Sequence, residues 1–276
     1  MWKRLRAKYK YSLILLRELV RTDFKVKYQD SFLGYIWSAL KPLFSFVVLY
    51  FVFIKVLRVG GDIEHWAVAL LVGIVLFQFF TDVTTGTLKS IVNNGNLLRK
   101  IKFPRYIIVV SNTVSALITL AINSAVIVGF AAFNGVQLGW GIMSILPFLL
   151  ELFVFSLGVA FFLSAAYVKF RDIQYIWDVV SQALFYGSAV IFPITMIQDI
   201  GHSLGTLFAY IALANPVAQV IQDIRHLAIS AEVPSLWTVS DGTVWAYAIP
   251  LGVTLVAFTI GAWYFHHKSP DFAENV

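Results

Sequence analysis

The sequence predicts an all-α membrane protein, because its composition and pattern both differ from those of a soluble domain. Hydrophobic residues make up 59% of the 276 residues and charged residues only 13%, whereas about 25% is usual for charged residues in soluble domains. The mean hydropathy is +0.79, and apolar residues gather in runs long enough to cross a bilayer. We expect six transmembrane helices, an N-terminal amphipathic interfacial helix, and two short re-entrant helices between spans five and six.

The spans form a single transmembrane domain over residues 1–276. They are expected at residues 36–56, 66–86, 106–133, 142–167, 173–193 and 244–265. The positions of Lys and Arg set the orientation: 18 of the 21 lie before span one, at its inner end, after spans two and four, or after span six. Both termini are therefore predicted to be cytoplasmic. Cations placed this way indicate membrane topology and not a nucleic-acid partner.

Residues 1–35 are too long and too charged for a signal peptide. Apolar residues instead recur at helical spacing in Tyr9, Leu13, Leu16, Val20 and Phe24. This spacing, with cations on much of the remaining surface, predicts a helix lying on the inner leaflet. A basic tail that only sets topology is the alternative interpretation.

The cytoplasmic connection 87–105 contains the motif NNGNLLRKIKFPR at residues 93–105. Its Asn and Gly residues favour turns and helix caps. A short helix should follow, with an apolar face of Leu97, Leu98 and Ile101 flanked by Arg99, Lys100 and Lys102. Pro104 is expected to end this helix before the next span. Positive charge is ordinary in such a loop, but a capped helix with an apolar anchor predicts contact with a partner protein.

The outer connection 194–243 should contain two short helices, since residues 203–214 are apolar but too few to cross a bilayer. Asn215 can cap the second helix, and Pro216 suits its first turn. Beyond them an apolar stripe of Val217, Val220, Ile221, Ile224, Leu227 and Ala228 faces a polar side of Gln219, Gln222, Asp223, Arg225 and His226. A pair dipping into the outer leaflet and an amphipathic surface cap both fit this pattern.

Motifs for catalysis are absent from the sequence. It contains no phosphate-binding G-x-x-x-x-G-K-[ST] loop, no H-E-x-x-H motif and no cysteine. We therefore expect a transport subunit without a cofactor, metal site or ATPase activity of its own. Glu151, Asp178 and Asp82 lie within or near spans and could form a proton relay; pairing with polar groups of the bundle is the alternative.

Spans one and five are rich in aromatic residues. The candidates for a translocation path are Trp37, Phe44, Tyr50, Phe51, Tyr175, Trp177, Phe185 and Tyr186. Aromatic faces stack on sugar rings by apolar contact, which suits a sliding polymer, but interfacial belts and lipid-facing packing use the same residues. In span four, the small residues Ser156, Gly158, Ala160, Ser164 and Ala165 predict close helix packing.

Four stretches in order, at 19–43, 93–105, 169–193 and 215–229, resemble the transmembrane subunit of ABC exporters for cell-surface polysaccharides such as O-antigen, capsule and teichoic acid. The resemblance implies a homodimer in the bacterial cytoplasmic membrane, working with two copies of a separate ATPase that binds ATP and Mg. It also implies an undecaprenyl-linked glycan as substrate.

The resemblance assigns roles to individual residues. The ATPase-coupling loop would contain Asn94, Asn96, Leu97, Leu98, Arg99, Lys100, Lys102, Phe103, Pro104 and Arg105. The interfacial helix would include Arg21, Asp23, Phe24, Lys25 and Tyr28, and the re-entrant hinge Asn215 and Pro216. Spans one and five would line the channel. A permease for drugs or lipids, a proton-coupled transporter and a membrane-embedded glycosyltransferase are the alternative functions.

Overall fold

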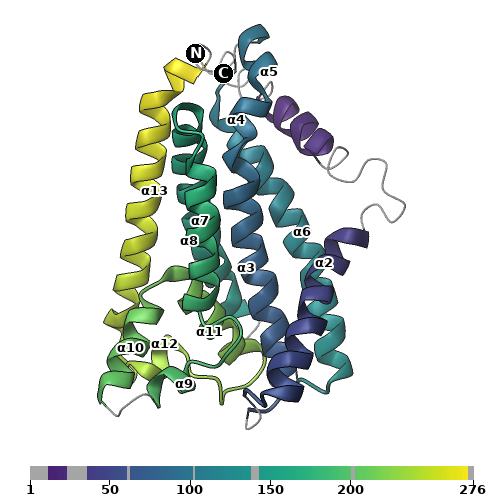
Figure 1. Cartoon of the computed structure of the whole chain (residues 1–276), viewed down its shortest axis with the longest axis vertical. Helices are drawn as coiled ribbons and strands as arrows, with labels where there is room; N and C mark the ends of the chain where they lie inside the picture. The colour runs from purple at the N-terminus through teal and green to yellow at the C-terminus, as the bar shows by residue number, and fades with distance from the viewer. Residues whose placement is uncertain are drawn as a thin grey trace.

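Helix α3 (Trp66–Leu88) lies in the middle of a bundle of helices (Figure 1). This arrangement comes from a computed structural model, which describes residues 12–23, 36–60, 63–101, 103–137, 143–199 and 203–272. Apolar residues cover most of the surface of α3, as is typical of a buried helix, and its side chains are buried along most of its length. Its neighbours are α2 (Ile36–Leu49), α6 (Tyr106–Phe133), α7 (Ile145–Lys169), α8 (Ile173–Gly187) and α11 (Pro216–Ala228).

The described residues form helices and no strands, and five helical segments are long and apolar enough to cross a membrane. These segments are Ala39–Val56, Trp66–Leu88, Tyr106–Phe133, Ile145–Lys169 and Val244–Asp271. The first continues α2 through the π-helix η1 (Tyr50–Val56). The last joins the 3-10 helices η3 (Val244–Tyr247) and η4 (Ser269–Asp271) to α13 (Ala248–Lys268). The predicted class, an all-α membrane protein with several spans, is confirmed.

The segment predicted as span five contains a shorter helix than expected. Helix α8 ends at Gly187, and residues 188–192 form a turn in place of the helix expected up to 193. Ala189 has a positive φ of 49°, which no helix accommodates. A sixth candidate span arises only when α10 (Ser203–Leu213) and α11, bent by 101°, are counted as one broken span.

Helices α7 and α13 pack against each other through glycine. A Cβ atom at Gly158 would lie 2.5 Å from the Phe258 Cα atom, and one at Gly261 would collide with the Gly158 carbonyl oxygen. The small residues around Gly158 in α7, namely Ser156, Ala160, Ser164 and Ala165, are all buried. The predicted close packing in this helix is confirmed, and its partner is α13.

The two ends of the bundle carry different short elements. At one end, here called the basic end, lie α4 (Ser90–Asn93), α5 (Gly95–Lys100) and the end of α13 with His266, His267 and Lys268 (Figure 1). The opposite end holds α9 (Thr195–Gln198), α10, α11 and α12 (Leu236–Val239).

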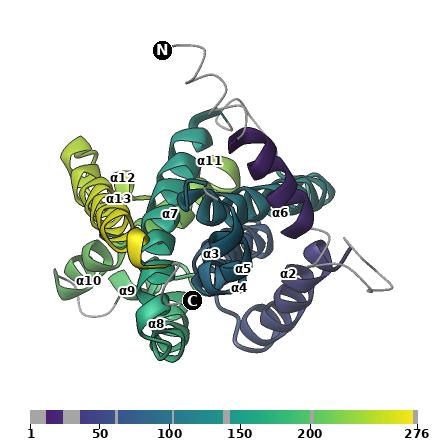
Figure 2. The ribbon, with the colours of Figure 1, turned by 90° about the horizontal axis from the view of Figure 1, so that it is seen from above.

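Residues 12–23 form a helix beside the main bundle, near α6 in the view from above (Figure 2). Leu15, Leu16, Leu19 and Val20 are partly buried, whereas Leu13, which the sequence places on the apolar stripe, is 64% exposed. Phe24, Lys25 and Tyr28 lie outside the described residues. A membrane-interfacial position for this helix stays a prediction.

Candidate functional site

A groove of about 730 Å³ runs between α2, α3 and α8, the helices that contain the predicted channel walls and the central helix. It is lined by Phe44, Ser45, Val48, Leu49, Ile74, Phe77, Gln78, Thr81, Asp178, Ser181, Gln182, Phe185 and Tyr186. The lining combines aromatic rings with amide, hydroxyl and carboxylate groups. Such a surface offers both apolar contact and hydrogen bonds to a ligand that carries hydroxyl groups.

Three of the predicted path residues, Phe44, Phe185 and Tyr186, line this groove. Phe185 packs edge-on against Phe77 of α3 at 5.1 Å and against Tyr186 at 5.5 Å between ring centroids. Phe44 and Tyr186 are more than half exposed. Two of the three rings are thus free for contact with a ligand, while Phe185 is held in place by its neighbours.

The other predicted path residues do not line the groove. Trp177 is buried, and its indole N–H donates to the Thr85 hydroxyl at 3.2 Å, so it joins α8 to α3. Tyr50 packs on Phe46 at 5.6 Å. Trp37, Phe51 and Tyr175 are exposed on the bundle surface.

The floor of the groove comes from α3, which sequence reasoning did not assign to the path. Gln78 and Thr81 contribute the polar part of this floor. Their spacing places them, with Asp82 and Thr85 farther along, on one face of an otherwise apolar helix. Gln78 Nε2 donates to Asp82 Oδ1 at 2.9 Å. This run of polar residues at one-face spacing is the signal that could have revealed the floor from the sequence.

A second, polar cavity of about 630 Å³ adjoins the groove toward the basic end, and Gln78 and Thr81 line both. Its further lining residues are Thr22, Asp23, Lys41, Asp82, Thr85, Gly86, Ser90, Asn93, Asn94, Asn112, Ser115, Ala116 and Thr119. Burial raises the pKa of the Asp23 carboxyl. Together the two cavities mark a polar route along α3 through an apolar bundle.

The predicted coupling segment forms α4 and α5 at the basic end. The Asn94 carbonyl accepts hydrogen bonds from the Leu97 and Leu98 amides at 3.0 Å, which starts the turn of α5. Arg99 and Lys100 are exposed, while Leu98 packs against the core. The apolar anchor and basic surface therefore lie on different sides of this short helix.

The end of the coupling segment differs from the prediction. Helix α5 ends at Lys100, and Ile101 is extended and 38% exposed. Ile101 is therefore not part of the apolar face of α5, and the helix ends before it reaches Pro104. The Pro104 carbonyl instead accepts from the Ile107 amide at the start of α6. Asn96, Phe103 and Arg105 are described, and Lys102 lies outside the described residues.

At the opposite end, Asn215 links α11 to the turn after α8. Its Oδ1 accepts from the Val217 amide at 3.0 Å, and its Nδ2 donates to the Ser188 hydroxyl at 2.9 Å. Pro216 occupies the first turn of α11, where a missing N–H costs nothing. The cap therefore fixes the start of α11 and the end of α8 together.

The polar side predicted for α11 is buried, contrary to an amphipathic surface helix. Gln219, Gln222, Asp223 and Arg225 are all at most 1% exposed. Periodicity alone assigns such residues to solvent, but here α3 and α7 cover the helix.

Arg225 is the centre of this buried set. Its guanidinium donates to the carbonyl oxygens of Ala69 at 2.8 Å, Ala189 at 2.9 Å and Val190 at 2.5 Å. It also lies 4.9 Å from the centroid of the Trp66 ring, a cation–π distance. Gly73 leaves the room that the guanidinium needs, because a Cβ atom there would collide with it. Arg225 thus ties α11, α3 and the end of α8 together.

Comparison with known proteins gives one consistent result. Residues 14–227 match the model of the family described as ABC-2 type transporter. An O-antigen export system permease protein RfbA of Klebsiella pneumoniae is 30% identical over 226 residues, covering 80% of this chain and 83% of that protein. A protein of the same name from Myxococcus xanthus is 27% identical over 194 residues, or 70% and 74% of the two chains. This chain belongs to the ABC-2 type transporter family.

Proposed function

We propose that this chain is the permease subunit of an ATP-driven exporter that moves a lipid-linked polysaccharide across the bacterial cytoplasmic membrane. The groove between α2, α3 and α8 carries the proposal. Its rings from Phe44 and Tyr186 suit the apolar faces of sugars, and its amide and hydroxyl groups suit sugar hydroxyls. The names of the similar O-antigen export permeases point to the same cargo, and an undecaprenyl-linked glycan is the form that we propose.

A second copy of the chain would complete the path. The groove is open on one side, where Phe44, Val48 and Tyr186 are exposed. Exposed rings and polar groups on one open face are better covered by protein than by lipid, since lipid cannot satisfy the polar ones. We therefore propose a homodimer with the two grooves facing each other.

The basic end is proposed to be cytoplasmic, as the placement of cations favours. Two copies of an ATPase subunit, which bind ATP and Mg, would dock there. The contacting residues are proposed to be Asn94, Asn96, Leu97, Leu98, Arg99, Lys100, Lys102, Phe103, Pro104 and Arg105. The N-terminal helix with Arg21 and Asp23 would lie on the inner leaflet. The pair α10 and α11, hinged at Asn215 and Pro216, would re-enter the outer leaflet.

The proposal is tested in a strain that lacks the chain, by measuring lipid-linked glycan held inside the cell and polysaccharide at the cell surface. Restoring the wild-type chain should restore export. Tyr186→Ala should lower the export rate by about threefold to tenfold, because an aromatic contact contributes about 0.5–1.5 kcal/mol. Phe133 is the last residue of α6, and its side chain is 91% exposed. Phe133→Ala is the matched control and should export normally.

Unchanged surface glycan in the deletion strain, together with altered drug tolerance, would replace the glycan by a drug or lipid cargo. Transport driven by a pH gradient without an ATPase, and abolished by Glu151→Gln, would favour the proton-coupled alternative. Equal export by Tyr186→Ala and Phe133→Ala would argue against the groove as the path.

A further inference from the structure

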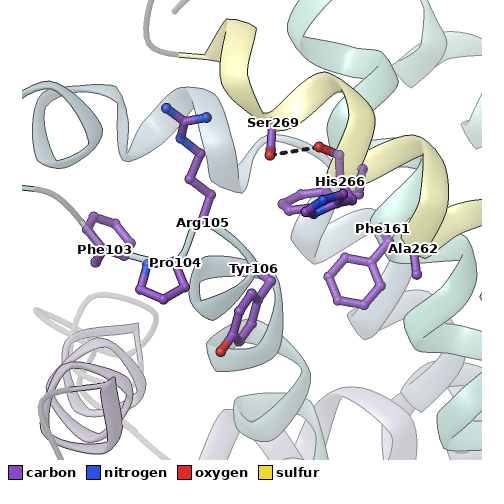
Figure 3. A pocket seen from close by; sticks show the side chains of 9 residues that line it. Phe103, Pro104, Arg105, Tyr106, Phe161, Ala262, His266 and Ser269 are labelled. Carbon is purple, nitrogen blue, oxygen red and sulfur yellow. Dashed lines mark hydrogen bonds between the residues drawn. The ribbon is translucent and has the colours of Figure 1, made fainter. Parts of the chain in front are cut away.

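A third cavity, of about 550 Å³, lies at the basic end between the start of α6, the body of α7 and the end of α13 (Figure 3). Its lining residues are Phe103, Pro104, Arg105, Tyr106, Phe161, Ala262, Phe265, His266 and Ser269. Figure 3 shows Arg105 and Tyr106 from the start of α6 on one side, and Phe161 and Ala262 on the other. The cavity is separate from the groove, since the two share no lining residue.

The polar groups around this cavity favour a negatively charged ligand. The Arg105 side chain makes no hydrogen bond or ion pair with another residue of the described ranges, and it is only partly buried. Tyr106 and His266, both exposed, add an O–H and a ring nitrogen, and none of the described residues that line the cavity is Asp or Glu. The Ser269 hydroxyl donates to the His266 carbonyl at 3.0 Å, which holds the end of α13 in position.

The remaining wall is apolar and continues into the spans. Phe161 and Phe265 are buried and pack at 5.1 Å between ring centroids, with Ala262 beside them. Along α13 toward the membrane, Leu251 and Leu255 are exposed, and their spacing from Ala262 places them on the same face of the helix as the cavity. A ligand that fits must therefore have an anionic head and an apolar body.

The position of the cavity matches such an amphiphile. It lies where α6 begins and α13 ends, so it is at the level where two apolar spans leave the bilayer. Trp263 stacks on His267 at 5.7 Å at this level, and Trp is typical of the membrane interface. Basic pockets between transmembrane helices at the cytoplasmic side bind phosphate head groups of lipids.

We propose that this cavity binds an anionic phospholipid, with its phosphate on Arg105 and its chains along Phe161 and the outward face of α13. The inner leaflet as the source rests on the orientation proposed above, but the site does not depend on the glycan cargo. Because Phe103, Pro104 and Arg105 are the last residues of the predicted coupling loop, the bound lipid would hold the end of that loop against α13.

The test measures lipid retained by the purified full chain in nanodiscs containing phosphatidylglycerol and phosphatidylcholine, by mass spectrometry after detergent extraction. Wild type should retain phosphatidylglycerol preferentially. Arg105→Gln should weaken this retention by about tenfold, as expected for one lost charged hydrogen bond. The control Arg171→Gln removes the same charge at the same end, from a side chain that lies over Tyr167, and should retain lipid as wild type does.

A second variant, Ala262→Leu, keeps every charge and fills the apolar wall, so it should also weaken retention. It keeps the proposal testable if Arg105→Gln does not fold. Equal retention by wild type and Ala262→Leu, or equal retention of both lipids by wild type, overturns the proposal. Displacement of phosphatidylglycerol by millimolar inorganic phosphate, or by polyprenyl pyrophosphate at lower concentration than the lipid, also overturns it.

Discussion

Arg225 and Arg105 lie at opposite ends of the bundle and differ in almost every physical respect. Arg225 is fully buried, and three carbonyl oxygens and the Trp66 ring surround it. Arg105 is partly exposed and without a partner among the described side chains. A satisfied buried cation fixes three elements in one arrangement, whereas an unpaired cation at a surface is available to a ligand. The difference teaches that the end with Arg225 holds its helices in one fixed arrangement, whereas the basic end with Arg105 offers a charged group to a binding partner.

The largest effect is expected at Arg225. Arg225→Met removes all guanidinium donors, which leaves the Val190 carbonyl buried without its partner and the Ala189 carbonyl with only the 3.3 Å bond from Gln222. This should destabilise the fold by about 3 kcal/mol or more. Arg225→Lys keeps the charge but cannot span three acceptors, so it should lie between Met and wild type. Thermal unfolding followed by tryptophan fluorescence measures this. A Lys variant as stable as wild type would show that charge alone, without the geometry of the guanidinium, holds this end.

A smaller effect is expected from Gly73→Ala, which places a methyl group where the guanidinium lies. We expect a loss of about 1–3 kcal/mol from overpacking. The matched control is Gly252→Ala in α13, where an added Cβ meets no atom within 4 Å; Ala is the better helix former there, so stability should be unchanged or slightly higher. Equal unfolding temperatures for the two variants would contradict the tight fit around Arg225.

The smallest effect on stability is expected at the basic end. Reversing both charges in Arg99→Glu/Lys100→Glu should change the unfolding free energy by no more than about 0.5 kcal/mol, since both side chains are exposed. Polysaccharide export, and any stimulation of ATP hydrolysis by this subunit, should nevertheless be lost. The control Lys55→Glu/Arg58→Glu reverses two exposed cations at the opposite end and should export normally. Normal export by the first variant would count against coupling through α5.

Sequence reasoning succeeded where the hydrophobic pattern is local and long. The predicted segment 106–133 has the bounds of α6, and a run of that length has no other interpretation in a membrane protein. Residue types at the start of α11 also predict its cap, because Asn and Pro act on their own neighbouring backbone.

Two of the failures, at the end of α8 and on the polar side of α11, come from contacts with distant parts of the chain. Residues 188–193 continue the apolar run of α8, so periodicity extends the helix through them. The turn there is held by Arg225, which is 36 residues from Ala189, and by the Asn215 cap. The same distant contacts bury the polar side of α11. The pattern of residues within one segment cannot show which distant segment will pack against it. The groove floor on α3 is different, because the polar spacing within that helix does carry a signal for it.

Gly158 and Gly261 bring the backbones of α7 and α13 into direct contact partway along α13. The helix extends from Gly261 about 10 Å to its end at Lys268 and about 20 Å the other way to Ala248. The backbones touch there without side chains between them. A side chain larger than glycine at either position would force the two helices apart. The two glycines therefore set the distance between α7 and α13, and with it the width of the third cavity, which is lined by residues of both helices.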